Sequence, residues 1–177
     1  MKKIFTIICF IACIGFHLSA YSQQTFPKSD FLMSMDIKFD APVVIDKSMR
    51  IFNITSGAVT GPDIRGIVQA PSADWVQIMP SGVIRLDVRL LVKTDDDDTI
   101  FISYNGVLKH SKQSIEKLNK GEEMTAEDGW YFVATPTFRT SSKKYDYLNG
   151  VQAINNYKVL RMSKDGGYAH IDVHAVK

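Results

Sequence analysis

The sequence predicts an all-β, mainly antiparallel domain with one short helix. Three observations lead to this prediction: about eight to ten short segments of alternating apolar and polar residues, turn-forming residues between them, and a length of 177 residues, which suits one domain. Strand side chains point alternately to two faces, so alternation indicates strands with one buried face. The pattern indicates a barrel or a sandwich.

The first half of the chain predicts a series of short strands separated by turns. Short strands are expected at residues 35–39, 49–54, 64–68 and 75–79, with bulges or turns at the glycines of residues 57–66 and a turn at residues 80–82. The clearest strand is 84–93, because Leu86, Val88 and Leu90 share one face and charged residues share the other. Residues 94–98 turn the chain, strand 99–104 returns, and Asn105-Gly106 predicts another turn.

The second half predicts the helix and the remaining strands. Residues 111–120 form the helix, with Ser111 as N-cap and Gly121 just past its C-terminus. Strands are expected at residues 130–135, 137–140, 151–162 and 168–176. Asn149-Gly150 and residues 165–167 have the composition of hairpin turns.

Residues 1–22 predict a secretory signal, because two lysines precede an apolar stretch and Ala20-Tyr21-Ser22 suits cleavage before residue 23. An uncleaved anchor and a lipoprotein at Cys13 are the alternatives. The mature chain would then comprise an N-terminal arm, 23–31, and one barrel or sandwich domain, 32–177, outside the cytoplasm, with no membrane span. It would carry equal numbers of acidic and basic residues and no cysteine, which argues against nucleic-acid partners, disulfides and thiol chemistry.

Arg85, Asp87 and Arg89 form a charged row on one strand face, spaced by about 6.6 Å per step. Two interpretations stay open. On a solvent-facing side, which periodicity alone favours, the row is three surface ions worth about 0–1 kcal/mol per pair. Inside a barrel, the guanidinium groups would hold Asp87 ionised and orient an anionic ligand.

The richest aromatic patch runs from Trp130 to Tyr147. Tyr131, Phe132, Phe138 and Tyr147 are candidates either for core packing or for the wall of a ligand cavity. No nucleophile elbow, phosphate loop or dinucleotide motif occurs. The acidic run 95–98 lacks calcium-loop spacing, and His170 and His174 lie too far apart along a strand to share a metal, so neither a metal nor a cofactor is expected.

Six ordered motifs resemble the domain of unknown function 3237 family, also called uncharacterised protein family 0311. Residues 57–66 resemble its G-G-x-x-x-G-P-x-x-x-G segment, 73–75 its A-D-W, 85–89 its L-D-x-R strand and 93–96 its T-D-D turn. Residues 131–138 resemble its Y-F-R-T-x-P-x-F segment and 145–149 its Y-x-W-L-N. Val133-Ala134 replaces the family's Arg-Thr and Tyr147 its Trp, which puts an equivalent cation in doubt.

The resemblance implies a small closed β-barrel similar to the allene oxide cyclase and dirigent type, which tends to hold an apolar or phenolic ligand in its lumen. It favours a lumen position for Asp87 and Arg89 and implies wall positions for Asp74, Tyr104, Tyr131 and Asn149. The site residues that we predict are therefore Asp87, Asp74 and Tyr131 for catalysis, and for ligand binding Arg89, Trp75, Tyr104, Phe132, Phe138, Tyr147 and Asn149.

Three functions stay open. The first is an extracytoplasmic barrel that binds a small, partly apolar or phenolic molecule. The second is a cofactor-independent isomerase, cyclase or lyase, in which Asp87 or Asp74 abstracts a proton and Tyr104 or Tyr131 polarises a carbonyl while Arg89 steers an acidic group. The third is a structural module that self-associates through an outward apolar face, and a homo-oligomer would suit the first two functions as well.

Overall fold

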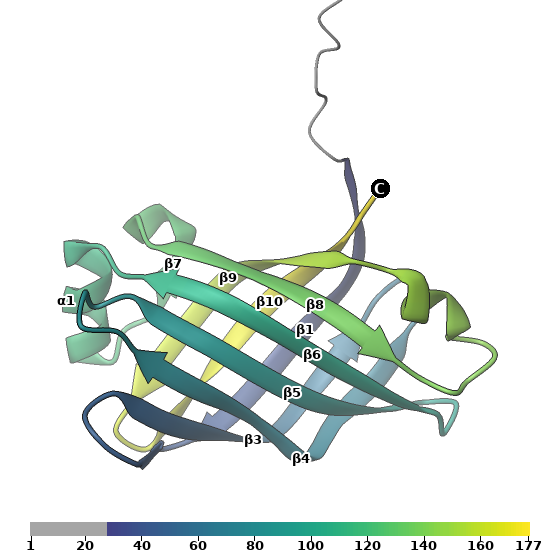
Figure 1. Cartoon of the computed structure of the whole chain (residues 1–177), viewed down its shortest axis with the longest axis horizontal. Coiled ribbons are helices and arrows are strands. Elements are labelled where there is room, and N and C mark those ends of the chain that lie inside the picture. Colours follow the sequence, from purple (N-terminus) through teal and green to yellow (C-terminus); the bar gives the residue numbers. More distant parts are fainter. Residues whose placement is uncertain (1–27) are drawn as a thin grey trace, which may run out of the picture.

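The computed structural model describes residues 28–177, which form a closed antiparallel barrel of eight long strands (Figure 1). In the sheet, β1 pairs with β10, the order continues through β9, β8, β6, β5 and β4 to β3, and β3 pairs back with β1. The predicted closed barrel is confirmed. Its strands are β1 (Ser29–Asp40), β3 (Met49–Thr60), β4 (Arg65–Ile78), β5 (Ile84–Thr94), β6 (Thr99–Lys109), β8 (Tyr131–Arg139), β9 (Ala153–Ser163) and β10 (Gly166–Val176).

The smaller elements lie at the two ends of the barrel. The two-residue strands β2 (Val43–Val44) and β7 (Met124–Thr125) pair with β3 and β9. Helix α1 (Lys112–Lys120) is capped as the sequence predicts: the Ser111 hydroxyl accepts the Ser114 N–H, and Gly121 adopts a φ of 67°. Single 3₁₀ turns occupy Ala126–Asp128 and Asp146–Gly150.

Several strands are longer than the sequence predicts. Segments 64–68 and 75–79 belong to one strand, β4, with a register shift between Gln69 and Ala73, and 130–135 and 137–140 are joined in β8. The predicted turn at Asn105-Gly106 is wrong, because both residues lie within β6. Gly106 is required for packing: a Cβ there would lie 2.8 Å from the Ala134 Cβ. Asn149-Gly150 forms part of a 3₁₀ turn rather than a tight hairpin.

The predicted N-terminal segments lie mostly outside the described residues. The signal, 1–22, Cys13 and residues 23–27 are not described, whereas β1 begins at Ser29 and takes in the last three residues of the predicted arm. Between residues 28 and 177, no helix combines the length and the apolar character needed to cross a membrane.

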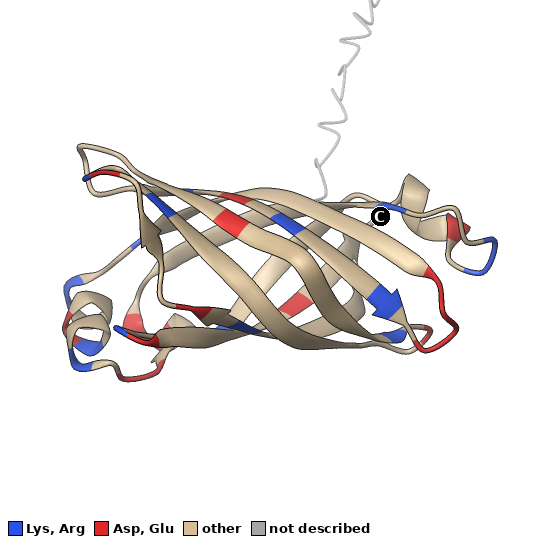
Figure 2. Cartoon of the chain, turned by 90° about the horizontal axis from the view of Figure 1, so that it is seen from below, with Lys and Arg blue, Asp and Glu red and all other residues tan. Residues whose placement is uncertain are grey.

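The apolar face of each strand points into the barrel. On β5, Val88, Leu90 and Val92 are at most 1% exposed, whereas the side chains of Asp87 and Arg89 are 41% and 52% exposed. The lumen-facing interpretation of the charged row is therefore wrong, and the solvent-facing one is correct. A row of three charged side chains lies on the outer face because burying unpaired charges is costly. Figure 2 shows acidic and basic residues mixed along the strands and loops rather than separated into faces.

Candidate functional site

A cavity of about 330 Å³ occupies the half of the lumen nearest α1. Most of its lining is hydrocarbon, supplied by inward-facing positions of all eight long strands and by Leu118 of α1. At the opposite end the lumen is filled by buried side chains such as Met33, Ile100 and Leu148. The polar members of the cavity lining are Arg50, Asp74, Tyr104, His110 and Tyr157.

Strand register places four of the lining residues in one row around the wall. Phe52 on β3 pairs with Asp74 on β4, Asp74 with Val88 on β5, and Val88 with Tyr104 on β6. These residues point inward because they occupy the same phase of the strand alternation as the core. The sequence therefore sets a single carboxyl group among apolar neighbours at this level of the barrel.

Asp74 is the carboxyl group of the cavity. Its Oδ1 accepts a hydrogen bond from the backbone N–H of Asp87 at 3.3 Å. Burial, helped by the nearby negative charge of Asp87, raises the pKa of Asp74 to about 7, although the Asp87 N–H acts in the opposite direction. A carboxyl group with that pKa exchanges a proton readily near neutral pH, so it can serve as acid or base.

Two tyrosine hydroxyls lie beside this carboxyl group. The Tyr104 and Tyr157 oxygens are 3.1 Å apart, and both side chains are buried. Burial raises the pKa of Tyr104 and of Tyr157 above the ordinary value, and the charge of Asp74 adds to the rise at both. Both hydroxyls therefore keep their protons at neutral pH and can donate hydrogen bonds.

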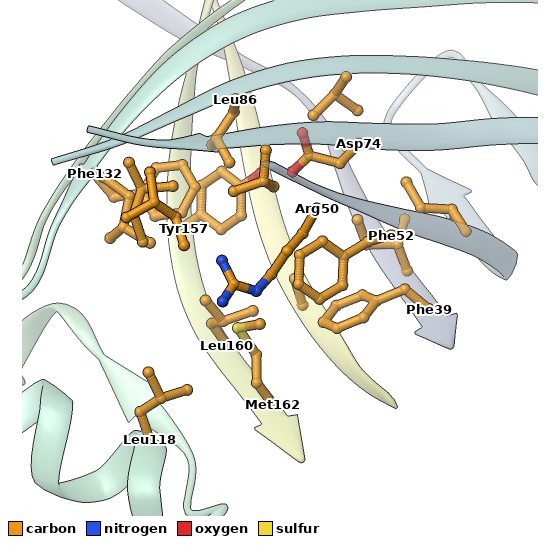
Figure 3. Close-up of a pocket in the computed structure, with 18 of the residues that line it drawn as sticks. Phe39, Arg50, Phe52, Asp74, Leu86, Leu118, Phe132, Tyr157, Leu160 and Met162 are labelled. Carbon is orange, nitrogen blue, oxygen red and sulfur yellow. The ribbon is translucent and has the colours of Figure 1, made fainter. Parts of the chain in front are cut away.

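Arg50 is the cation of the cavity. Figure 3 shows its guanidinium directed into the cavity, away from Asp74 and toward Leu160. Its Nη1 is shielded from solvent and has no hydrogen-bond partner among residues 28–177, and none of the ion pairs in that part of the chain involves Arg50. A guanidinium does not lose its proton in a protein, so it stays charged here.

Aromatic rings form the two sides of the cavity. Phe39 and Phe52 pack edge to face with centroids 5.6 Å apart, and Phe132 stacks on Tyr157 at 3.5 Å. At the α1 end, His110 Nδ1 lies 3.0 Å from the Ser114 hydroxyl, and burial lowers the pKa of His110. The cavity thus offers flat apolar surfaces and a few separated polar groups.

The structure divides the predicted site residues. Asp74, Tyr104 and Phe132 line the cavity together. Phe138 points inward but belongs to the packed core and does not line the cavity. The remaining predicted residues lie outside the lumen: Asp87, Arg89, Trp75, Tyr131, Tyr147 and Asn149.

Asp87 and Tyr131 do border one hollow, but it is an open depression on the outer surface of the sheet. There Arg89 bonds to Asp87 at 3.0 Å and lies over the Trp75 ring, 5.0 Å from its centroid. At the far end of the barrel, the Asn149 side chain bonds to both the N–H and the carbonyl of Thr140 and so orders a loop. None of these residues lines the cavity that contains Asp74.

Sequence reasoning missed Arg50, Tyr157 and His110. Arg50 carried a usable signal, because it occupies the same strand face as the apolar residues Phe52 and Ile54.

Val133, which replaces the family's Arg, lies on the outer surface of the barrel, so a cation at that position would not enter the lumen. Between residues 28 and 177, no three His, Cys, Asp or Glu side chains are grouped as metal ligands would be.

Comparisons with known proteins agree with the motifs. The family model described as "Protein of unknown function (DUF3237)" matches residues 27–176. A UPF0311 protein of Clostridium acetobutylicum is 30% identical over 122 residues, which cover 66% of this chain and 77% of that protein.

Two crystal structures share the barrel. A conserved protein of unknown function from Rhodopseudomonas palustris superimposes with a TM-score of 0.75 at 23% identity, covering 86% of this chain and 99% of that one. A β-barrel-like protein from Acinetobacter baumannii gives a TM-score of 0.67 at 25% identity, covering 88% and 99%. Family model, relative and fold agree with the six motifs, and the chain belongs to the DUF3237 family.

Proposed function

We propose that this barrel binds a small, partly apolar or phenolic molecule in its lumen. The observation that supports this most is the cavity of about 330 Å³, whose wall is hydrocarbon except for a few separated polar groups. Small-molecule sites commonly have volumes of about 300–1,000 Å³ and this composition, in which apolar contacts supply affinity and a few polar groups fix orientation. The size favours a compact ligand.

The ring pairs support an aromatic ligand. Phe39, Phe52 and Phe132 present faces and edges at which a planar molecule can pack, and aromatic contacts of this kind add about 0.5–1.5 kcal/mol beyond area burial. The Tyr104 and Tyr157 hydroxyls provide hydrogen bonds for a phenol or carbonyl oxygen.

The test is binding of the neutral fluorescent probe N-phenyl-1-naphthylamine. We expect saturable fluorescence enhancement for the wild type and its loss in Val76→Trp, which fills the cavity from β4. Ile67→Trp is the matched control, since Ile67 lies on the outer face of the same strand and is 59% exposed. Circular dichroism checks that both variants fold. Absence of binding to the wild type, or equal binding to both variants, contradicts the proposal.

A second candidate is acid–base catalysis in the same cavity, as in an isomerase, cyclase or lyase. The observation that favours it is Asp74, with a pKa of about 7, next to two protonated hydroxyls. In its ionised form Asp74 would take a proton from a carbon adjacent to a carbonyl, Tyr104 or Tyr157 would donate a hydrogen bond to the enolate oxygen, and the proton would return at another carbon. The earlier alternative, with Asp87 as base and Arg89 as guide, lacks an enclosed site.

Deuterium incorporation tests this candidate. We expect the wild type to accelerate exchange of the protons adjacent to the carbonyl of 1-tetralone in D₂O, as followed by proton NMR, and Asp74→Asn to lose the acceleration. Asp87→Asn is the matched control, because Asp87 lies on the outer surface of the adjacent strand. An exchange rate equal to that of buffer alone for the wild type would leave binding as the better-supported function.

We also propose that the protein acts outside the cytoplasm, periplasmic or secreted, after cleavage before Gln23. Mass spectrometry of the mature protein would find residue 23 at its N-terminus, whereas a lipidated Cys13 would contradict this cleavage site.

The self-associating module remains a proposal, but its argument is weaker, because the outward face of β5 carries Arg85, Asp87 and Arg89 rather than apolar residues. Analytical ultracentrifugation would distinguish monomer from oligomer.

A further inference from the structure

Arg50 forms no ion pair among residues 28–177 and lies in a largely hydrocarbon cavity. Asp46 is exposed on the β2–β3 connection, where hydrogen bonds from Ser48 and Met49 mainly, and the charge of Arg50 to a smaller extent, lower its pKa. The shielded Nη1 of Arg50 lacks a partner among the described residues, and the neighbouring lining includes Phe39, Phe52, Leu160 and Met162 (Figure 3). A charged group placed in such surroundings costs stability unless an opposite charge and hydrogen bonds compensate it. The apolar residues around it supply neither.

Asp74 does not supply the missing charge. Arg50 faces Val76 across the β3–β4 pair, whereas Asp74 faces Phe52, so the two positions lie two residues apart along the strands, about 7 Å. The Arg50 guanidinium also turns away from Asp74 (Figure 3). The two groups therefore contact different parts of any molecule that fills the cavity.

We propose that the lumen ligand is a monocarboxylic acid with an aromatic or other apolar body, whose carboxylate pairs with the Arg50 guanidinium. This inference rests on the proposed binding function and specifies the ligand class. The planar guanidinium can donate two parallel hydrogen bonds to a carboxylate, which gives both affinity and orientation.

The charged side chains that line the cavity favour a ligand with a single negative charge. Arg50 is the only Lys or Arg among the residues that line the cavity, and His110 there is disposed to be neutral, since burial lowers its pKa. A phosphate monoester would bring a charge of about −1.5 to −2. Asp74 would add repulsion when ionised. One guanidinium matches one carboxylate.

Strand direction places the carboxylate near the mouth and the body deeper. Arg50 is the second residue of β3 and follows the β2–β3 connection, which lies at the same end of the barrel as α1, and Leu118 of α1 also lines the cavity. The row of Phe52, Asp74, Val88 and Tyr104 lies further inside. A ligand would therefore enter with its apolar body first and keep its acidic group at Arg50.

The experiment compares matched probes: 2-naphthylacetic acid, the neutral alcohol 2-(2-naphthyl)ethanol, and 1-naphthyl phosphate, each displacing N-phenyl-1-naphthylamine. For the wild type we expect the acid to bind at least about tenfold more tightly than the alcohol, as for a hydrogen-bonded charge pair, and more tightly than the phosphate. In Arg50→Gln the preference for the acid should disappear while the alcohol keeps its affinity. Arg50→Lys should retain part of the preference, because it restores the charge without the planar fork.

Arg85→Gln is the matched control, since Arg85 lies on the outer face of β5 and its loss should leave all three affinities unchanged. Equal affinities of acid and alcohol for the wild type, or an acid preference that survives in Arg50→Gln, would overturn the carboxylate inference and leave lumen binding intact. Tighter binding of the phosphate would overturn the single-charge assignment. If neither the fluorescent probe nor any competitor binds, the proposed function fails as well, and the comparison within the wild type needs no variant to fold.

Discussion

At the scale of single residues, Asp74 links the cavity to the pH dependence of stability. Its folded-state pKa of about 7 lies above the ordinary value of 3.8, so the unfolded chain loses this proton first as the pH rises. Stability attributable to Asp74 is therefore full below pH 3.8 and falls between about pH 4 and 7. We expect Asp74→Asn to be more stable than the wild type at pH 8, by up to a few kcal/mol at ~1.4 kcal/mol per pKa unit, and similar to it near pH 4.

Urea unfolding of both proteins between pH 4 and 8 measures this difference. Other carboxylates contribute equally to both proteins, so the comparison isolates Asp74. A difference in unfolding free energy that does not change with pH would show that Asp74 has an ordinary pKa in the folded protein.

At the same scale, we expect Arg50 to lower the stability of the ligand-free protein while it strengthens binding of an acidic ligand. Arg50→Met keeps an unbranched side chain but removes the unpaired charge, so we expect the free protein to gain about 0.5–2 kcal/mol of unfolding free energy while acid binding is lost. Denaturant unfolding without ligand checks the first part. A less stable Arg50→Met protein would mean that Arg50 has a stabilising partner of its own.

At the scale of elements, Asp128 holds α1 at the mouth of the cavity. Its buried carboxylate accepts hydrogen bonds from Gln113 and Lys117 of α1, at 2.9 Å each, and from the Thr125 N–H at 2.7 Å. Lys117 and the Thr125 N–H lower the pKa of Asp128, so its contribution is present above the ordinary carboxyl pKa of 3.8 and is lost as the pH falls below that value. Because Leu118 lines the cavity, this network also sets the position of the mouth.

Asp128→Ala should therefore loosen the helix without unfolding the barrel. We expect faster amide hydrogen exchange across Lys112–Lys120 than in the wild type, with little change in β5 and β6, because local opening depends on local contacts. The neighbouring exposed Glu127 offers the control, Glu127→Ala. Unchanged exchange in α1 would show that the caps alone hold the helix.

At the scale of the whole molecule, the barrel closes where β1 meets β3. Ile37 pairs there with Gly57, and a Cβ at Gly57 would lie only 2.6 Å from the Asp36 carbonyl oxygen. We expect Gly57→Ala to lower the unfolding free energy by about 1–3 kcal/mol, because the two backbones must separate. Gly150→Ala, where a Cβ would meet nothing within 4 Å, should change it by less than about 0.5 kcal/mol. Equal effects in urea unfolding would contradict a tight β1–β3 closure.

Much of the architecture follows from local pattern. Alternation predicted the core face of β5, Ser111 and Gly121 predicted the ends of α1, and the motifs predicted the family and the closed barrel. Prediction failed where a residue type has two uses. Asn105-Gly106 has the composition of a turn, yet Gly106 lies mid-strand because Ala134 approaches it from β8, a contact between residues far apart in the sequence.

The sequence by itself determined which residues alternate and that one face of the strands is mainly apolar. Only the tertiary structure decided that this apolar face is the lumen, which moved Asp87, Arg89 and Tyr131 outside and left Asp74 with Tyr104 inside. It also brought Arg50 and Tyr157 into the same cavity from strands about a hundred residues apart. Period-two alternation distinguishes two faces but does not say which is enclosed; closure of the sheet around the larger apolar surface decides that, because burying it lowers the free energy most.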